Sequence, residues 1–189
     1  MKLLKQRISL SLAGLALAGA MLPGLTHAQS GDPAATMDFN TMSKQDQRDF
    51  CSGVAQTAQA VARELPIRVD RTTTLVGSVA SYQDNRCIYF LDYVVNEPGV
   101  FEVTYQEMKK AGTVLDSRAE TMAFIKDFYA TGSQGYQEFK ENLRSQLTNN
   151  EQFARFAAVP FLELRANYTL KGDDVMDDIS IVVGRNNGS

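Results

Sequence analysis

The sequence lacks tryptophan, holds only two cysteines, and has a single histidine among its 189 residues. That histidine, His27, falls within an N-terminal stretch that has the features of an export signal, so the processed chain is expected to lose it. Ser-His-Asp and Cys-His catalysis both need an imidazole, and so do metal sites built on histidine. These chemistries are therefore excluded for the processed chain.

The first 28 residues predict a cleaved leader. Three basic residues open it, residues 8–22 are mostly apolar, and small residues precede a junction after Ala28. This order is typical of secretory signals, and the apolar stretch is short for a membrane span. We expect a periplasmic or secreted protein of the bacterial envelope, without a stable membrane anchor.

Nucleotide-binding and acyl-transfer signatures are also missing: the chain has no G-x-x-x-x-G-K-[ST], G-x-G-x-x-G, G-x-S-x-G or S-x-x-K.

The formal net charge of the chain is −3, and loss of the basic leader makes it about −6. Phosphate binding needs clustered lysine and arginine, but the longest basic run is 109–110. We therefore expect no nucleic-acid partner, and we predict no cofactor or metal.

Cys51 and Cys87 are expected to form a disulfide, because an exported chain meets an oxidising compartment. The bridge would tie the first helix to a strand and stabilise the fold by about 3–4 kcal/mol. The alternative is a reactive thiol, although no Cys-x-x-Cys is present to support redox chemistry.

The first half of the chain predicts a helix followed by a β-hairpin. The helix begins near Ser43, and its apolar stripe is Phe50, Val54, Ala58, Val61 and Leu65. The hairpin is predicted from β-branched stretches at 67–69 and 72–80, a turn at 82–85 and a second strand at 86–95. Both faces of the second strand are largely apolar, so we expect it to be central and covered on both sides.

The second half predicts a turn at 96–99, and then an ambiguous stretch at 100–112. Alternation over the first six residues of this stretch favours a strand, with a short helix after it. Further elements are expected as follows: a helix from Ser117 to about Ala130, a helix from Tyr136 to Leu147, a helical turn near Phe153 and Phe156, and a hairpin joining 161–170 to 175–183 through a turn at 171–174.

The order of these elements predicts an α+β fold. We expect an antiparallel sheet of two hairpins, flanked by an N-terminal helix and two or three central helices. Residues 100–105 would add a fifth strand if they are extended. The expected organisation is a leader at 1–28, a flexible segment at 29–40, a single α+β domain at 41–184 and a tail at 185–189.

Acidic residues offer two further candidates. Asp173, Asp174, Asp177 and Asp178 surround the last turn, where they would either bind Ca²⁺ or simply supply turn chemistry. Asp92 interrupts an apolar strand face, and a buried aspartate must find a partner or shift its pKa. It would be either a structural ion-pair member, with Arg68, Arg71 or Arg86 as partner, or a functional acid.

Aromatic residues gather in the two helical segments between 117 and 147. They either pack in the core or line an apolar groove for an amphipathic helix or an extended strand. As candidate partner-binding residues we name Phe124, Phe128, Tyr129, Tyr136 and Phe139.

Residues 65–70 (LPIRVD), 72–76 and the strand at 87–95 resemble the first hairpin of small exported bacterial proteins that include type II secretion pilotins. Residues 139–156 and 164–170 resemble their last helix and hairpin. The resemblance covers about half of the processed chain, and implies a helix-flanked antiparallel sheet that binds a polypeptide without catalysis. Pilotins are lipoproteins, however, and no lipid-accepting cysteine follows this leader.

Together these observations predict a non-enzymatic, exported binding protein with a protein or peptide partner, similar to a secretion or assembly accessory factor. One alternative is a carboxylate-dependent enzyme acting on envelope glycans, with Asp92 as one of its two acids. Another is a carrier of a small molecule or lipid, which would need an enclosed apolar cavity.

Overall fold

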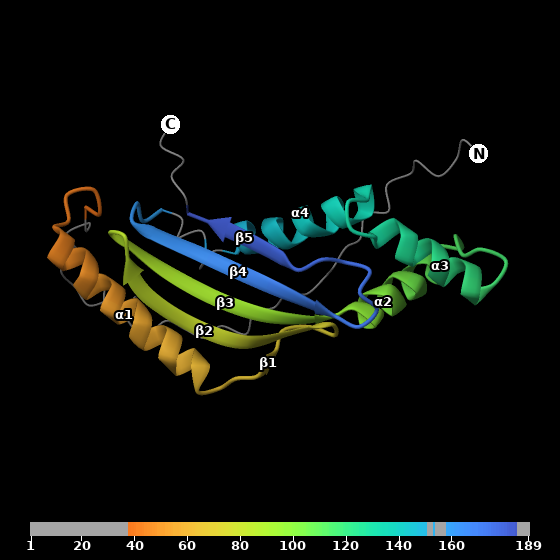
Figure 1. Ribbon diagram of the computed structural model, residues 1–189, viewed down its shortest axis with the longest axis horizontal. Coiled ribbons are helices and arrows are strands. Elements are labelled where there is room, and N and C mark those ends of the chain that lie inside the picture. Colours follow the sequence, from red (N-terminus) through yellow and green to blue (C-terminus); the bar gives the residue numbers. More distant parts are fainter. Residues whose placement is uncertain (1–37, 151–152, 154–157, 185–189) are drawn as a thin grey trace, which may run out of the picture.

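The computed structural model describes residues 38–150, 153 and 158–184. Over this part, a helix and three strands are followed by three helices and two strands (Figure 1). The predicted α+β class is confirmed. The predicted leader, the predicted tail and Phe156 lie outside the described residues, as does most of the segment expected to be flexible.

Helix α1 (Lys44–Ala62) begins at a capping box, in which Ser43 Oγ accepts a hydrogen bond from Asp46 N. The Asp46 carboxylate in turn accepts from Ser43 N, so two backbone donors at the helix start are satisfied. The inner side of the helix buries Cys51 and Ala58.

Strand β1 (Ile67–Arg68) pairs antiparallel with β2 (Thr73–Gln83), which pairs antiparallel with β3 (Arg86–Asn96). Asp84 and Asn85 both have positive φ values, 50° and 60°. A two-residue turn of this kind matches the twist of the flanking strands, and confirms the predicted hairpin.

Residues 97–110 form helix α2 (Glu97–Lys110), so the predicted turn at 96–99 and the predicted strand at 100–105 are both wrong. Asn96 caps the helix by accepting a hydrogen bond from Gly99 N, and a proline in the first turn suits a helix start. The residues that the helix buries recur at helical rather than alternating spacing: Glu97, Val100, Phe101, Thr104 and Met108.

Helices α3 (Arg118–Tyr129) and α4 (Gln134–Asn149) confirm the two predicted central helices. Each begins at a serine, Ser117 or Ser133, whose hydroxyl accepts a backbone N–H from the first turn. The apolar stripe of α4 is buried as predicted, and consists of Tyr136, Phe139, Leu143 and Leu147.

Strands β4 (Leu162–Lys171) and β5 (Ile179–Val183) pair antiparallel and complete a sheet of order β1-β2-β3-β4-β5. The expectation of a purely antiparallel sheet is wrong, because β3 and β4 are parallel. The helices between them carry the chain back to the end of the sheet where β3 starts, as a parallel pair requires. The last strand begins at residue 179, four residues later than predicted.

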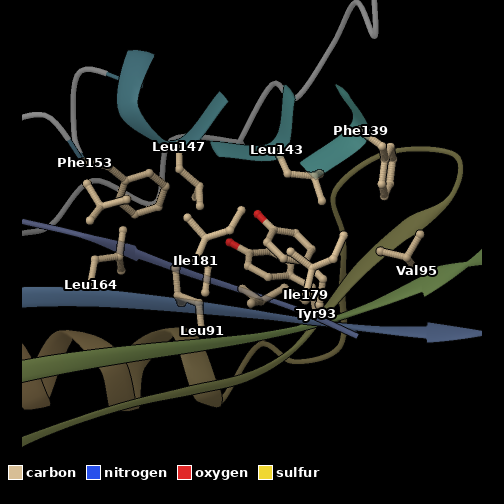
Figure 2. Packing of buried hydrophobic residues seen from close by; sticks show 14 of the residues in the cluster. Leu91, Tyr93, Val95, Phe139, Leu143, Leu147, Phe153, Leu164, Ile179 and Ile181 are labelled. Atoms are coloured by element: carbon tan, nitrogen blue, oxygen red, sulfur yellow. The ribbon is translucent and has the colours of Figure 1, made fainter. Parts of the chain in front are cut away.

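Helices α1 and α4 pack on the same face of the sheet. From α1, Ala58 O accepts a hydrogen bond from Ser78 Oγ on β2. From α4, Leu143 and Leu147 lie over the sheet, on the side to which Leu91 points (Figure 2). Neither of these helices packs on the second face of β3, where Ile88 is nevertheless buried and Phe90 is half-buried. The expectation that β3 is covered on both sides therefore stays a prediction for the second face.

Candidate binding site on the open face of the sheet

The predicted disulfide is confirmed. Cys51 of α1 and Cys87 of β3 are bonded, with their Cα atoms 5.4 Å apart, and both residues are buried. The bridge fixes α1 against the start of the central strand pair, so it is a structural cross-link rather than a reactive site.

The five aromatic candidates divide into an inner and an outer group. Tyr129, Tyr136 and Phe139 are buried in the core, whereas Phe124 and Phe128 are half-buried. The inner hydroxyls are engaged, since that of Tyr129 shares a hydrogen bond with Thr104 and that of Tyr136 donates to the backbone carbonyl of residue 177. Of the five candidates, the two outer rings are the ones that keep surface for a partner.

Close approach of two helices explains why the inner rings are enclosed. Gly135, in the first turn of α4, lies directly against Phe128 of α3, and an added Cβ there would overlap the Phe128 carbonyl and ring. The contact brings α3 and α4 together, so that Tyr129 packs edge-on against Phe139 at a centroid distance of 6.0 Å.

The acidic residues near the last turn stabilise the loop that connects β4 to β5. Asp173 forms an ion pair with Lys126 of α3 at 2.5 Å, and Asp178 accepts a hydrogen bond from Leu170 N at 2.9 Å. Asp174 has a positive φ of 53°, as turn residues often do. Nowhere in the described ranges do three or more histidine, cysteine or acidic side chains gather as a metal site would require.

The sheet face opposite α1 and α4, which we call the open face, carries a different set of side chains. Strands alternate the direction of their side chains, so the open-face residues are those between the core positions. The pairing of the strands places these residues side by side in rows that run across the sheet. The open-face residues of the candidate site are Gly77, Val79, Arg86, Phe90, Asp92, Glu163, Arg165, Asn167, Ser180 and Val182.

One row is a chain of hydrogen bonds. Asn167 Nδ2 donates to Asp92 Oδ1 at 2.9 Å, and Asn167 Oδ1 accepts from Ser180 Oγ at 3.0 Å. Gly77 stands opposite Asp92, where a Cβ would come within 2.6 Å of its carboxylate oxygen. Asp92 therefore has a neutral partner, Asn167, and not the predicted arginine, and it lies wedged against the neighbouring strand.

A second group is a charged cluster. The buried Glu163 carboxylate accepts from Arg86 Nη1 at 3.1 Å and from Arg165 Nε at 2.5 Å. The guanidinium of Arg165 also lies over the ring of Phe90, 5.4 Å from its centroid. Both arginine side chains keep exposed surface, 51% for Arg86 and 35% for Arg165. The carboxylate and ring thus hold two guanidinium groups in place at the surface.

Apolar side chains lie between these polar groups. Val79, opposite Phe90, is 54% exposed, and Val76 at the irregularity in β2 is 43% exposed. These two valines are among the few large apolar side chains of the described segments that remain this exposed. The open face therefore combines accessible apolar surface with polar groups that are already oriented.

The open face does not have the geometry of paired-acid catalysis. Its acids, Asp92 and Glu163, lie four rows apart along the strands, which corresponds to about 13 Å. Paired carboxylates in glycosidases are separated by about 5–9.5 Å. Each acid here is also hydrogen-bonded to a side chain that it holds in place, so the arrangement favours binding.

Sequence reasoning did not name most of the open-face residues. The usable signal was on β4, where Glu163, Arg165, Asn167 and Thr169 alternate with core residues and so predict one polar face. The partners of these residues on β3 were hidden because Ile88, Phe90 and Val94 are apolar, although they share this face.

Comparison with family models, with curated proteins and with solved structures finds no significant match to the chain. Within the described residues, no helix has the length and apolar character that crossing a bilayer requires. Function must therefore be inferred from the chemistry of the chain's own surface.

Proposed function

We propose that this protein is an exported, non-enzymatic binding protein that holds a polypeptide partner on its open face. The observation that carries the proposal is the cluster of Arg86, Glu163, Arg165 and Phe90. It holds two partly exposed guanidinium groups in fixed positions beside exposed valines. Groups held in this way lose little side-chain entropy when a partner binds.

The chemistry of the face favours a polypeptide. Arginine and aromatic side chains are enriched where proteins contact one another, and apolar surface with satisfied polar groups is typical of such interfaces. Among the described residues, the cluster carries two positive charges for one buried negative charge, in a chain whose net charge is negative. A segment with apolar side chains and at least one exposed carboxylate would complement Val79, Phe90 and the two arginines.

The finer form of the proposal is an assembly or secretion accessory factor of the bacterial envelope. Its support is the leader, with the resemblance to pilotins at residues 65–95 and 139–170. The disulfide is consistent with an oxidising compartment. In this role the partner would be a subunit of an envelope machine, held without covalent chemistry.

Site-specific photo-crosslinking in envelope preparations tests the open face. The crosslinker is placed at Val79, and, as a matched control, at Val114, an exposed valine between α2 and α3. We expect one polypeptide to crosslink at position 79 and not at 114. Arg165→Glu should abolish that product, because it removes a guanidinium and adds a charge that repels a carboxylate.

The outcomes separate the alternatives. Equal crosslinking at both positions, or a product that survives Arg165→Glu, would contradict binding at the open face. Urea unfolding of the Arg165→Glu protein, compared with the parent, shows whether the loss of product reflects the surface or the fold.

A further inference from the structure

The outer edge of β2 is unpaired over most of its length. The strand has 11 residues, and the two-residue strand β1 pairs with it at Thr74 and Leu75. In the described part of the chain, no hydrogen bond reaches this outer edge between residues 78 and 83. The strand at the opposite edge of the sheet, β5, is less than half as long, with 5 residues. The longer free edge is therefore that of β2.

The pairing of the strands shows which backbone groups of β2 point outward. Cys87 of β3 donates its backbone N–H to the carbonyl of Phe161, on the side of β4, at 2.8 Å. The N–H and C=O of one strand residue point to the same side, so Cys87 forms no ladder bond with its β2 partner, Tyr82. Tyr82 therefore directs both backbone groups outward. Alternation along the strand gives the same direction to Ala80 and Ser78, and the residues between them bond to β3.

This edge carries none of the usual protection against pairing with another strand. Edge strands are commonly guarded by charged residues or by proline, and the sequence of β2, TTLVGSVASYQ, contains neither. Instead, Val76 and Val79 of β2 are 43% and 54% exposed. Unpaired backbone groups beside exposed apolar side chains form a template that an extended segment can complete.

Helix α1, which runs alongside β2 (Figure 1), supplies a charge at this edge. One flank of α1 faces the core, where the ring of Phe50 packs edge-on against that of Phe161. The other flank faces outward, because the guanidinium of Arg48 lies over the ring of Tyr82, 5.6 Å from its centroid. Arg48 is exposed and forms no ion pair within the described residues. It is therefore available to a carboxylate of a partner.

We propose that a segment of the polypeptide partner binds as an extended strand added to the free edge of β2. This inference rests on the proposed function, because it states how the partner of the open face is held. The outward N–H and C=O groups of Ser78, Ala80 and Tyr82 would form ladder hydrogen bonds with the backbone of that segment.

The two sides of the edge define the sequence of the added strand. Side chains of a strand alternate between its two faces. Those on the open-face side would lie beside Val79, so we expect them to be apolar. Those on the other side would lie beside α1, and we expect one of them to be an aspartate or glutamate that pairs with Arg48. The partner segment is thus an alternating, apolar and acidic strand.

Hydrogen exchange at single amides, measured by NMR in the purified oxidised protein, tests whether the edge is free. We expect the amides of Ala80 and Tyr82 to exchange at least about 10-fold faster than those of Val79 and Ser81, which bond to β3. Equal protection at the four positions would mean that the edge is already paired, as it would be by a second copy of this chain. That result would overturn the proposal.

The photo-crosslinking assay at Val79 tests whether the partner uses the edge. Two variants are compared, Ala80→Pro and Ala80→Val, whose new side chains have the same number of carbon atoms. Only proline removes the outward N–H, and an edge strand tolerates proline where that N–H faces away from the sheet. We expect at least about 10-fold less product from the proline variant than from the valine variant.

A charge reversal tests the acidic residue of the partner. Arg48→Glu should lower the yield of the product at position 79 several-fold, because the new carboxylate repels that of the added strand. Lys44→Glu is the matched control, since Lys44 is an exposed cation in the first turn of α1 that also lacks an ion pair within the described residues. It should give the parental yield.

The outcomes separate this inference from the proposed function. Absence of a product at position 79 in the parent would contradict the function itself. Equal yields from Ala80→Pro and Ala80→Val would leave a partner on the open face but overturn its binding as an added strand. Urea unfolding shows whether both variants are folded. Should the proline variant fail to fold, equal yields from Arg48→Glu and Lys44→Glu would overturn the proposal instead.

Discussion

The carboxylate of Glu97 accepts a hydrogen bond from the backbone N–H of Met176, 79 residues later in the chain, at 2.6 Å. The same Oε1 atom accepts from Val175 N, and Oε2 accepts from Asp173 N, both at 2.8 Å. Glu97 is fully buried at the start of α2. One side chain thus fixes the connection between β4 and β5 to the end of β3.

Replacing Glu97 by glutamine should destabilise the protein by about 2–4 kcal/mol. The amide offers one acceptor oxygen, so its NH2 group would face one of the three backbone donors and leave it unsatisfied. Urea unfolding of the oxidised protein measures the change. Glu107→Gln is the matched control, because Glu107 is an exposed α2 residue paired with Lys110, and its loss should cost less than about 1 kcal/mol. Similar effects for the two variants would contradict the role of Glu97.

Gly77→Ala should destabilise the protein by about 1–3 kcal/mol, because the new methyl group would overlap Asp92. Gly53, inside α1, has no atom within 4 Å of an added Cβ. Gly53→Ala should therefore stabilise the protein by about 0.5–1 kcal/mol through helix propensity. Thermal unfolding of the two variants should shift in opposite directions. A neutral Gly77→Ala would mean that Asp92 is not held against β2.

Removal of the disulfide by Cys51→Ala/Cys87→Ala should lower stability by about 3–4 kcal/mol, because the bridge closes a loop between residues 36 positions apart. Urea unfolding of this variant should match that of the reduced parent. An unchanged midpoint would show that the bridge adds nothing to the packing of α1 on β3.

Much of the fold follows from local patterns. The stripe of α1, the Asp84–Asn85 turn and the caps of α3 and α4 depend on neighbours in sequence, so they could be predicted. The prediction for the start of α2 was wrong because Asn96 and Pro98 suit a turn as well as a helix start. The usable helix signals were the two lysines of the last turn of α2 and the glycine that follows it, Gly112, which has a positive φ in the structure.

Other features depend on partners that are distant in sequence. The parallel pairing of β3 with β4 is set by where α2, α3 and α4 return the chain, which no local pattern records. The cluster at Glu163 needs Arg86, from 77 residues earlier, and the pairing of Asp92 needs Asn167. The candidate site could therefore not be assembled from the sequence alone, although the residue types in it could be noted.

Buried tyrosines make stability depend on alkaline pH. Burial raises the pKa of Tyr93, Tyr168, Tyr89 and Tyr129 in the folded chain. In the unfolded chain each phenol loses its proton near pH 10, about its ordinary pKa, while the folded chain retains it. Deprotonation therefore lowers the free energy of the unfolded state and not that of the folded state. This stabilising effect is complete below about pH 10 and is lost progressively above it.

The predicted slope is a loss of up to about 1.4 kcal/mol per pH unit for each such tyrosine. Urea unfolding at several values between about pH 8 and 11, with phenolate absorbance of the folded protein recorded in parallel, measures it. In the Tyr93→Phe/Tyr168→Phe variant, the free energy of unfolding should fall less steeply with pH. The slope should lack the contribution of two phenols, because neither phenylalanine can ionise. An equal slope in parent and variant would show that these two phenols, which are 2% and 3% exposed, ionise in the folded protein as readily as in water, and so are not enclosed in the core.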